Sequence, residues 1–275
     1  MQSVVAIVMG GQISPVDECL AVFLSQVSDV GARVAILPTA CDNPQVVQAY
    51  TRGLLELGLH RPPLILPIWE RAQAEDRTLW RIFSQIDGLL ILGGNVIRLL
   101  RVVRESQLRC ILQQALVAGM VIAGISAGAA VLGDLVFVSD HPLSSNRRWQ
   151  SGWGLLPRIV IVPHFRQRRR QKILMQLLMH YPTWLGVGVD EATAAVLSPK
   201  GIHATGSGQV TLMMANPLAP YLSGGSLPWA IHLQAGQSLA WDTLPIPSLP
   251  MIITRAGMLP TVTGTADIML HFFKQ

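Results

Sequence analysis

The sequence predicts an α/β protein built as a three-layer sandwich, with helices on both faces of a mainly parallel central sheet. Short apolar runs typical of buried strands alternate with helix-compatible segments from the N-terminus onward. Half of the residues are hydrophobic and only 13% are charged, which suits strands buried on both faces better than a half-solvated antiparallel sheet. The 275 residues are enough for a single large domain, and we expect one spanning residues 1–275.

The alternation continues as far as residue 132 and defines the elements of the first half. Predicted strands cover residues 4–9, 33–37, 64–68, 88–92 and 120–124. Predicted helices cover residues 16–27, 44–57, 72–85, 97–118 and 127–132. This rhythm indicates βαβ units with right-handed crossovers.

The second half changes character. Strands are expected at residues 135–138 and 158–162, a helix at 167–180, and short strands at 185–189, 194–197, 202–205 and 210–214. Beyond Asn216 the chain is rich in proline and glycine, so residues 216–275 are predicted to hold loops and edge strands. We therefore place the core at about residues 1–215, followed by a strand-rich C-terminal extension.

Composition argues against several classes of function. The uncharged stretch 115–133 is about as long as a bilayer span, but glycines divide it and a strand, turn and helix explain it without lipid. Residues 1–3 carry no basic residue typical of a signal peptide, so a cytoplasmic protein is expected. The three cysteines are scattered without metal-ligand spacing, and we expect no metal or other cofactor. The net charge of +5 is mostly dispersed and aromatic residues are sparse, so no nucleic-acid partner is expected.

Ser126 is the strongest candidate nucleophile. It lies between Gly124 and Gly128, where an apolar strand gives way to a helix. Small neighbours permit a sharp bend and let a substrate carbonyl approach the hydroxyl. The free N–H groups at the start of the following helix suit a developing oxyanion.

Other strand ends are expected to gather near this serine, because the carboxyl ends of parallel strands meet at one sheet edge. Three small-residue turns follow strands directly, at residues 10–11, 38–40 and 93–95. The backbone N–H groups of Gly93 and Gly94 are therefore further oxyanion candidates.

A serine nucleophile needs a base and an orienting acid. His164 is the best-placed histidine because it follows the predicted strand 158–162, with His141 as its close rival. Glu191 and Asp140 each follow a strand, and the sequence leaves the choice between these two carboxylates open. The neighbouring Asp190 is a weaker candidate that suits a turn cap.

A basic cluster opens the predicted helix 167–180 and comprises Arg166, Arg168, Arg169, Arg170 and Lys172. Cations at the positive end of a helix are unfavourable by a few tenths of a kcal/mol each unless something compensates them. A ligand carboxylate held by guanidinium groups would compensate them. A solvated basic face or a nucleic-acid patch are the alternatives.

Taken in order, these segments resemble the cyanophycinase and α-aspartyl dipeptidase family of serine peptidases, and most closely its cyanophycinase-like branch. The resemblance covers roughly the first 215 residues. The segments that carry it are Gly10-Gly11, Ile36-Leu37-Pro38-Thr39-Ala40, Gly93-Gly94-Asn95, Gly124-Ile125-Ser126-Ala127-Gly128-Ala129, His164-Phe165-Arg166-Gln167-Arg168, Gly186-Val187-Gly188-Val189-Asp190-Glu191-Ala192-Thr193-Ala194 and Gly206-Ser207-Gly208.

The resemblance implies an α/β sandwich related to class I glutamine amidotransferases, with a flavodoxin-like sheet, a peptide or polymer substrate, no metal, and often a homodimer. It implies Ser126 as nucleophile, His164 as base and Glu191 as acid, whereas the dipeptidase branch places an aspartate nearer Asp140. Oxyanion N–H groups would come from Gly94 and Ala127. Substrate contacts would come from Asn95, Arg168 and Arg170, and the substrate of this family is of the β-Asp-Arg type.

The departures from this family pattern lie at residues that contact substrate. Val96 stands where cyanophycinases carry glutamine, Val162-Pro163 replaces Asp-Gln, and Ile173 replaces an arginine of the basic helix. Losing an amide and a carboxylate removes hydrogen-bonding groups that a polar substrate needs. The sequence therefore supports two hypotheses, a cyanophycinase-like serine peptidase and a non-catalytic or altered-specificity binding protein. A nucleic-acid role for residues 166–172 is a minor third.

Overall fold

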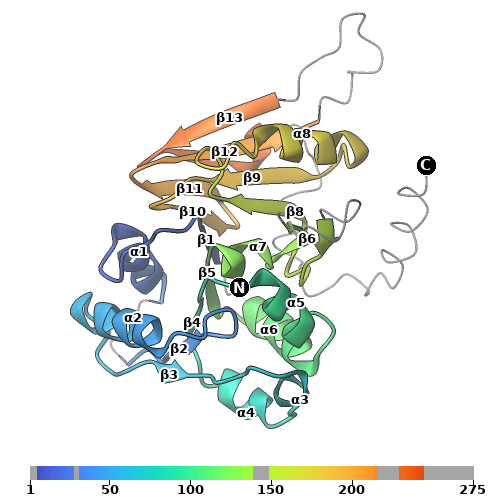
Figure 1. Cartoon of the computed structure of the whole chain (residues 1–275). Coiled ribbons are helices and arrows are strands. Elements are labelled where there is room, and N and C mark those ends of the chain that lie inside the picture. Colours follow the sequence, from blue (N-terminus) through green and yellow to red (C-terminus); the bar gives the residue numbers. More distant parts are fainter. Residues whose placement is uncertain (1–4, 28–30, 139–148, 216–228, 245–275) are drawn as a thin grey trace, which may run out of the picture.

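The computed structural model describes residues 5–27, 31–138, 149–215 and 229–244, and it contains two sheets with helices packed against them (Figure 1). The mixed α/β class predicted from the sequence is confirmed. The larger sheet has the strand order β14 (Ser238–Ala240), β11 (Gly201–Gly206), β10 (Thr193–Ser198), β1 (Ala6–Met9), β5 (Val121–Ile125), β4 (Gly88–Ile91), β2 (Val34–Leu37), β3 (Leu64–Ile65).

The strands from β1 to β3 in that order are all parallel, as the alternation predicted. β10, β11 and β14 extend this sheet in antiparallel fashion on the β1 side. Successive residues of β1 face opposite layers, because side chains alternate along a strand. Ile7 packs toward α1 (Glu18–Gln26) and α2 (Pro44–Glu56), whereas Val8 packs toward α5 (Val96–Val103) and α6 (Gln107–Val117). Helices therefore cover both faces of the parallel part.

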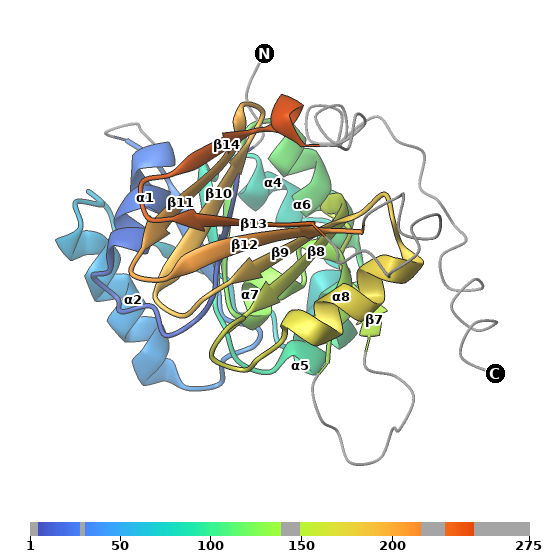
Figure 2. The ribbon, with the colours of Figure 1, turned by 90° about the horizontal axis from the view of Figure 1, so that it is seen from above.

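A second sheet lies across the first and was not predicted from the sequence (Figure 2). Its strand order is β13 (Trp229–Gln234), β12 (Gln209–Met214), β9 (Leu185–Val189), β8 (Leu156–Pro163), β6 (Gly133–Phe137), β7 (Trp149–Ser151). β6, β8 and β9 are parallel to one another, and the outer strands are antiparallel. The helix α8 (Gln171–His180) packs Leu174 and Leu178 onto this sheet.

Three predicted elements are shorter or divided in the structure. Residues 97–118 form two helices, α5 and α6, because the Ser106 side chain caps the second one by accepting from the Arg109 N–H. Residues 72–85 form the short helices α3 (Arg71–Ala74) and α4 (Leu79–Phe83), with Asp76 bonding the Thr78 N–H between them. Pairing of the third strand is limited to Leu64–Ile65.

The described part of the C-terminal extension agrees with the expectation of edge strands. β13 and β14 lie at the outer edges of the two sheets, and the 3₁₀ helix η2 (Trp241–Thr243) follows β14. The rest of residues 216–275 lies outside the described ranges. Within those ranges, the helices are too short or too polar to cross a membrane.

Candidate active site

The strand ends meet at one edge of the parallel sheet, as predicted. The Ser126 N–H donates to the Met9 carbonyl at 2.9 Å, and the Asn95 N–H donates to the Ala40 carbonyl at 2.8 Å. A Cβ atom on Gly93 would lie 3.2 Å from the Ser126 Cβ. The turns at 10–11, 38–40 and 93–95 thus converge on the serine.

Ser126 occupies a strained bend between β5 and the short helix α7 (Ala127–Ala130). Its φ of 52° and ψ of −108° are rarely adopted by a residue with a side chain. The bend brings Gly124 so close to the next turn that a Cβ there would lie 2.3 Å from the Gly128 carbonyl oxygen. Only a glycine fits at Gly124, which explains the small-residue pattern around the serine.

A hydroxyl, an imidazole and a carboxylate form a continuous hydrogen-bonded chain. The Ser126 Oγ lies 2.7 Å from the His164 Nε2, and the His164 Nδ1 lies 2.6 Å from the Glu191 Oε1. His164 follows β8 and is buried, while Glu191 lies between β9 and β10 and is partly exposed. Of the two candidate acids, Glu191 contacts the imidazole; Asp140, like His141, lies outside the described residues.

The surroundings of His164 favour the neutral imidazole. Burial lowers the pKa of His164 below its ordinary value, and the positive charges of Arg168 and Arg170 lower it further. The Glu191 hydrogen bond and charge act in the opposite direction on this pKa without outweighing them. A neutral imidazole bonded to a serine hydroxyl is able to accept its proton.

The Gly10-Gly11 turn is hydrogen-bonded to the two backbone segments that carry His164 and Glu191. The backbone N–H of His164 donates to the Gly10 carbonyl at 2.9 Å, and the backbone N–H of Ala192 donates to the Gly11 carbonyl at 2.8 Å. Gly11 has a φ of 110°, and a Cβ on it would lie 2.3 Å from the His164 Cε1. The histidine ring therefore rests directly on the Gly11 backbone.

Asp190 holds the two loops that carry His164 and Glu191, a function close to the turn cap suggested by the sequence. This fully buried carboxylate accepts from the Arg166 N–H and the Gln209 N–H, each at 3.0 Å, and from the Arg166 Nε. The Gln167 side chain also accepts from the Glu191 N–H at 3.2 Å. Sequence reasoning missed both the reach of Asp190 to Gln209 and the contact of Gln167, because neither is local in the chain.

The expected oxyanion donors Gly94 and Ala127 belong to the two turns that meet at Ser126. Gly94 has a φ of 138° and lies in the turn whose Gly93 approaches Ser126. Within the described chain, neither of these two N–H groups has a protein acceptor. Both are therefore free to donate to an external oxygen.

The three residues expected to contact substrate occupy different environments. The Asn95 Oδ1 accepts from the Arg98 N–H at 3.1 Å and so caps α5. Arg168 is exposed and near enough to His164 to affect its pKa. Arg170 is buried, donates to the Pro163 carbonyl at 2.8 Å, and lies 5.3 Å from the centre of the Phe137 ring.

At the start of α8, a hollow of about 470 Å³ is lined by Phe165, Arg166, Arg169, Gln171, Lys172 and Met175. Within the described ranges, no three His, Cys, Asp or Glu side chains come together in a way that would hold a metal ion.

A serine, a histidine and a carboxylate joined in line at the ends of strands are the arrangement of a serine hydrolase.

Comparison with known proteins assigns the chain to one family of peptidases. The model of peptidase family S51 matches residues 6–205. The chain is 30% identical over 239 residues to cyanophycinases of Trichormus variabilis and of a Nostoc species, covering 82% of this chain and 80% of each relative. The protein belongs to peptidase family S51 and is a serine-type peptidase.

Solved structures show the same fold. A peptidase from an acI-B1 actinobacterium aligns with a TM-score of 0.66 at 22% identity, covering 86% of this chain and 96% of that one. A putative peptidase E of Listeria monocytogenes aligns with a TM-score of 0.53 at 16% identity, covering 74% of this chain and 98% of that one.

Proposed function

We propose that this protein hydrolyses peptide or isopeptide bonds through an acyl-enzyme formed on Ser126. The observation that carries the proposal is the unbroken chain from the Ser126 hydroxyl through His164 to Glu191, with both links at hydrogen-bond distance. Each member comes from a different strand end, so the fold brings together residues far apart in sequence.

In the first step the Ser126 Oγ attacks the scissile carbonyl while the His164 Nε2 takes the hydroxyl proton. The imidazolium that forms is stabilised and oriented by the Glu191 carboxylate at Nδ1. His164 then gives its proton to the leaving amine, which departs and leaves an ester on Ser126. In the second step the same imidazole takes a proton from water as the water oxygen attacks the ester carbonyl. The bond from that carbon to the Ser126 Oγ then breaks, His164 returns its proton to Oγ, and the acid is released.

The tetrahedral intermediates carry a negative oxygen, and we assign its stabilisation to the Gly94 and Ala127 N–H groups. Their position beside Ser126 and their lack of a protein acceptor within the described chain support this assignment. Preorganised donors of this kind are worth about 3 kcal/mol each in related sites.

The substrate class we propose is an Asp-containing or β-Asp-Arg type peptide or polymer. The named cyanophycinase relatives and the exposed Arg168 beside His164 support it. Val162 and Pro163 are both buried at the end of β8, where the family pattern has polar residues, so the hydrogen-bonding groups of that pattern are absent here. We therefore propose a specificity that differs from that of the cyanophycinases.

Three finer points stay predictions from the sequence. They are the relationship of the sandwich to class I glutamine amidotransferases, a cytoplasmic location, and a homodimer.

The test is whether the protein hydrolyses a panel of α-Asp and β-Asp dipeptides and cyanophycin. Hydrolysis is measured as the release of free amine. We expect activity that Ser126→Ala lowers by about 10⁴-fold or more. Ser25→Ala, which changes an exposed serine of α1, serves as the matched control and should leave the rate unchanged. A panel bound but never cleaved by the wild-type protein would instead support the binding-protein hypothesis.

A further inference from the structure

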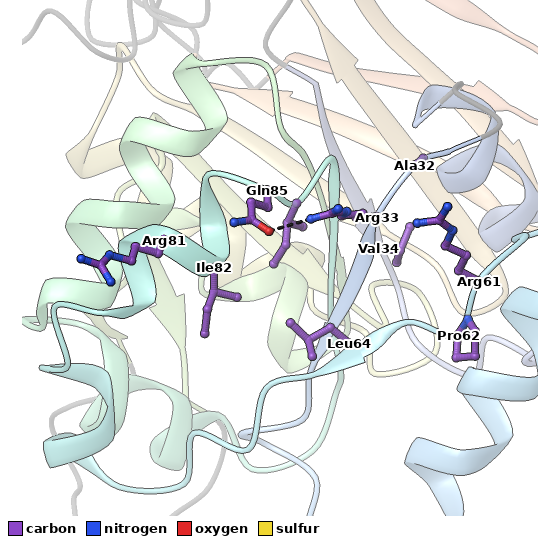
Figure 3. Close-up of a pocket in the computed structure, with 10 residues that line it drawn as sticks. Ala32, Arg33, Val34, Arg61, Pro62, Leu64, Arg81, Ile82 and Gln85 are labelled. Atoms are coloured by element: carbon purple, nitrogen blue, oxygen red, sulfur yellow. Dashed lines mark hydrogen bonds between the residues drawn. The ribbon is translucent and has the colours of Figure 1, made fainter.

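A second hollow lies at the opposite end of the parallel strands from Ser126. It is lined by residues at the start of β2, at and before the start of β3, and around α4, and its volume is about 400 Å³ (Figure 3). Val34 and Leu64 are the first residues of their strands, whereas the serine lies at the carboxyl end of β5. The hollow is therefore separate from the site of hydrolysis.

Three arginines line this hollow, namely Arg33, Arg61 and Arg81, and all are exposed. In Figure 3, Arg33 lies between Gln85 and Arg61, and Arg81 lies on the far side of Ile82. The Arg33 Nη1 donates to the neutral Gln85 amide oxygen at 2.6 Å. The nearby carboxylate of Asp87 is bonded to the Arg33 backbone N–H instead.

Within the described part of the chain, none of these three guanidinium groups forms an ion pair with a carboxylate. By contrast, Arg71, Arg98 and Arg166 each have an acidic partner. Like charges gathered around one hollow repel each other unless an anion neutralises them. The planar donors of arginine match the oxygens of a carboxylate or a phosphate.

The remaining wall of the hollow is apolar. Pro62, Leu64 and Ile82 contribute to it, and the Leu64 side chain at the edge strand β3 is 49% exposed. The volume lies within the range of about 300–1,000 Å³ typical of small-molecule sites. Cationic donors beside apolar side chains suit a ligand with an anionic end and a short apolar body.

We propose that this hollow binds a small organic anion, with its phosphate or carboxylate group on Arg33 and Arg61 and its apolar body on Leu64. Arg81 contributes long-range attraction from the rim. Such a site gives the peptidase a ligand-binding function independent of the serine chemistry.

The test is calorimetric titration of the Ser126→Ala protein with phenyl phosphate, benzoate and inorganic phosphate at low salt. We expect saturable binding of an aromatic anion, with phenyl phosphate or benzoate binding more tightly than inorganic phosphate because of the apolar wall. The stronger of the two identifies the anionic group. Equal binding of inorganic phosphate would overturn the role of Leu64.

Variants localise the binding. Arg61→Ala should weaken it about tenfold, consistent with losing a charge-assisted hydrogen bond, and Arg61→Lys less so because it keeps only the charge. Arg52→Ala, an exposed arginine of α2 outside the hollow, is the matched control and should bind like the parent. Absence of saturable binding, or binding unaffected by Arg61→Ala, would overturn the proposal without bearing on peptide hydrolysis.

Discussion

Replacing Gly11 with alanine is expected to disable hydrolysis through the position of His164 rather than through unfolding. The added Cβ would lie 2.3 Å from the ring Cε1 and 2.6 Å from Nε2. Ordinary carbon contacts begin near 3.5 Å, so the ring or the turn must move by about 1 Å. The ring is held at 2.7 Å from Ser126 and 2.6 Å from Glu191, and such a shift breaks at least one of these bonds.

A displacement of about 1 Å at a catalytic group costs about a hundredfold in rate, and we expect kcat for Gly11→Ala to fall by at least that factor. The left-handed φ of 110° adds backbone strain of about 1–2 kcal/mol to the folded state. The assay is kcat on a cleaved Asp-containing peptide, together with the thermal midpoint of unfolding.

Two glycines provide matched controls. Gly58 has a φ of 103° with no atom within 4 Å of its added Cβ, so Gly58→Ala carries the backbone strain without the contact. Gly31→Ala carries neither. We expect Gly58→Ala to lower the midpoint by about 2–4 °C per kcal/mol of strain while retaining full activity. A Gly11→Ala protein that keeps kcat within threefold of wild type would refute the reasoning.

Four further predictions concern the same site. Arg168→Ala should move the acidic limb of the kcat/KM pH profile to higher pH, because it removes a positive charge that lowers the pKa of His164. Glu191→Gln should move that limb to lower pH and reduce the rate by about 10⁴-fold, and a shift in the same direction for both variants would contradict the electrostatics. Ser126→Gly should be more stable than Ser126→Ala by about 1 kcal/mol in urea unfolding, because glycine accepts the strained φ; equal stabilities would show that the bend is unstrained. Asp190→Ala should lower the free energy of unfolding by about 2–4 kcal/mol, because it removes the acceptor of three N–H donors. Asp190→Asn should lower it by an intermediate amount, and a loss below about 1 kcal/mol for Asp190→Ala would contradict the structural role of Asp190.

The parallel part of the fold was predictable because its signals are local. Strands such as Val34–Leu37 are continuous apolar runs, and helices between them have clear periodicity. Because the carboxyl ends of parallel strands meet at one sheet edge, the sequence predicts that Ser126, Gly11 and Gly93 lie together. Ser106, which divides one predicted helix in two, was missed because a serine in an apolar helical pattern is an ambiguous signal.

The second sheet could not be predicted from the sequence. The sequences of β6, β8 and β9 predict strands, but no local sequence feature indicates that β6 pairs with β8 rather than with a strand of the first sheet. The choice between Glu191 and Asp140 was open for the same reason, because both follow strands. The parallel pairing of β8 with β9 in the second sheet brings the Glu191 side chain to His164.

Covalent labelling is the direct test that Ser126 is a nucleophile activated by His164. The protein is treated with a fluorophosphonate probe and analysed by intact mass and peptide mapping. We expect one adduct, on Ser126, and labelling that His164→Ala slows by about 10³-fold or more. A protein that cleaves a peptide but forms no adduct on Ser126 when treated with the probe would contradict this mechanism. Labelling of the His164→Ala variant at the wild-type rate would contradict it as well.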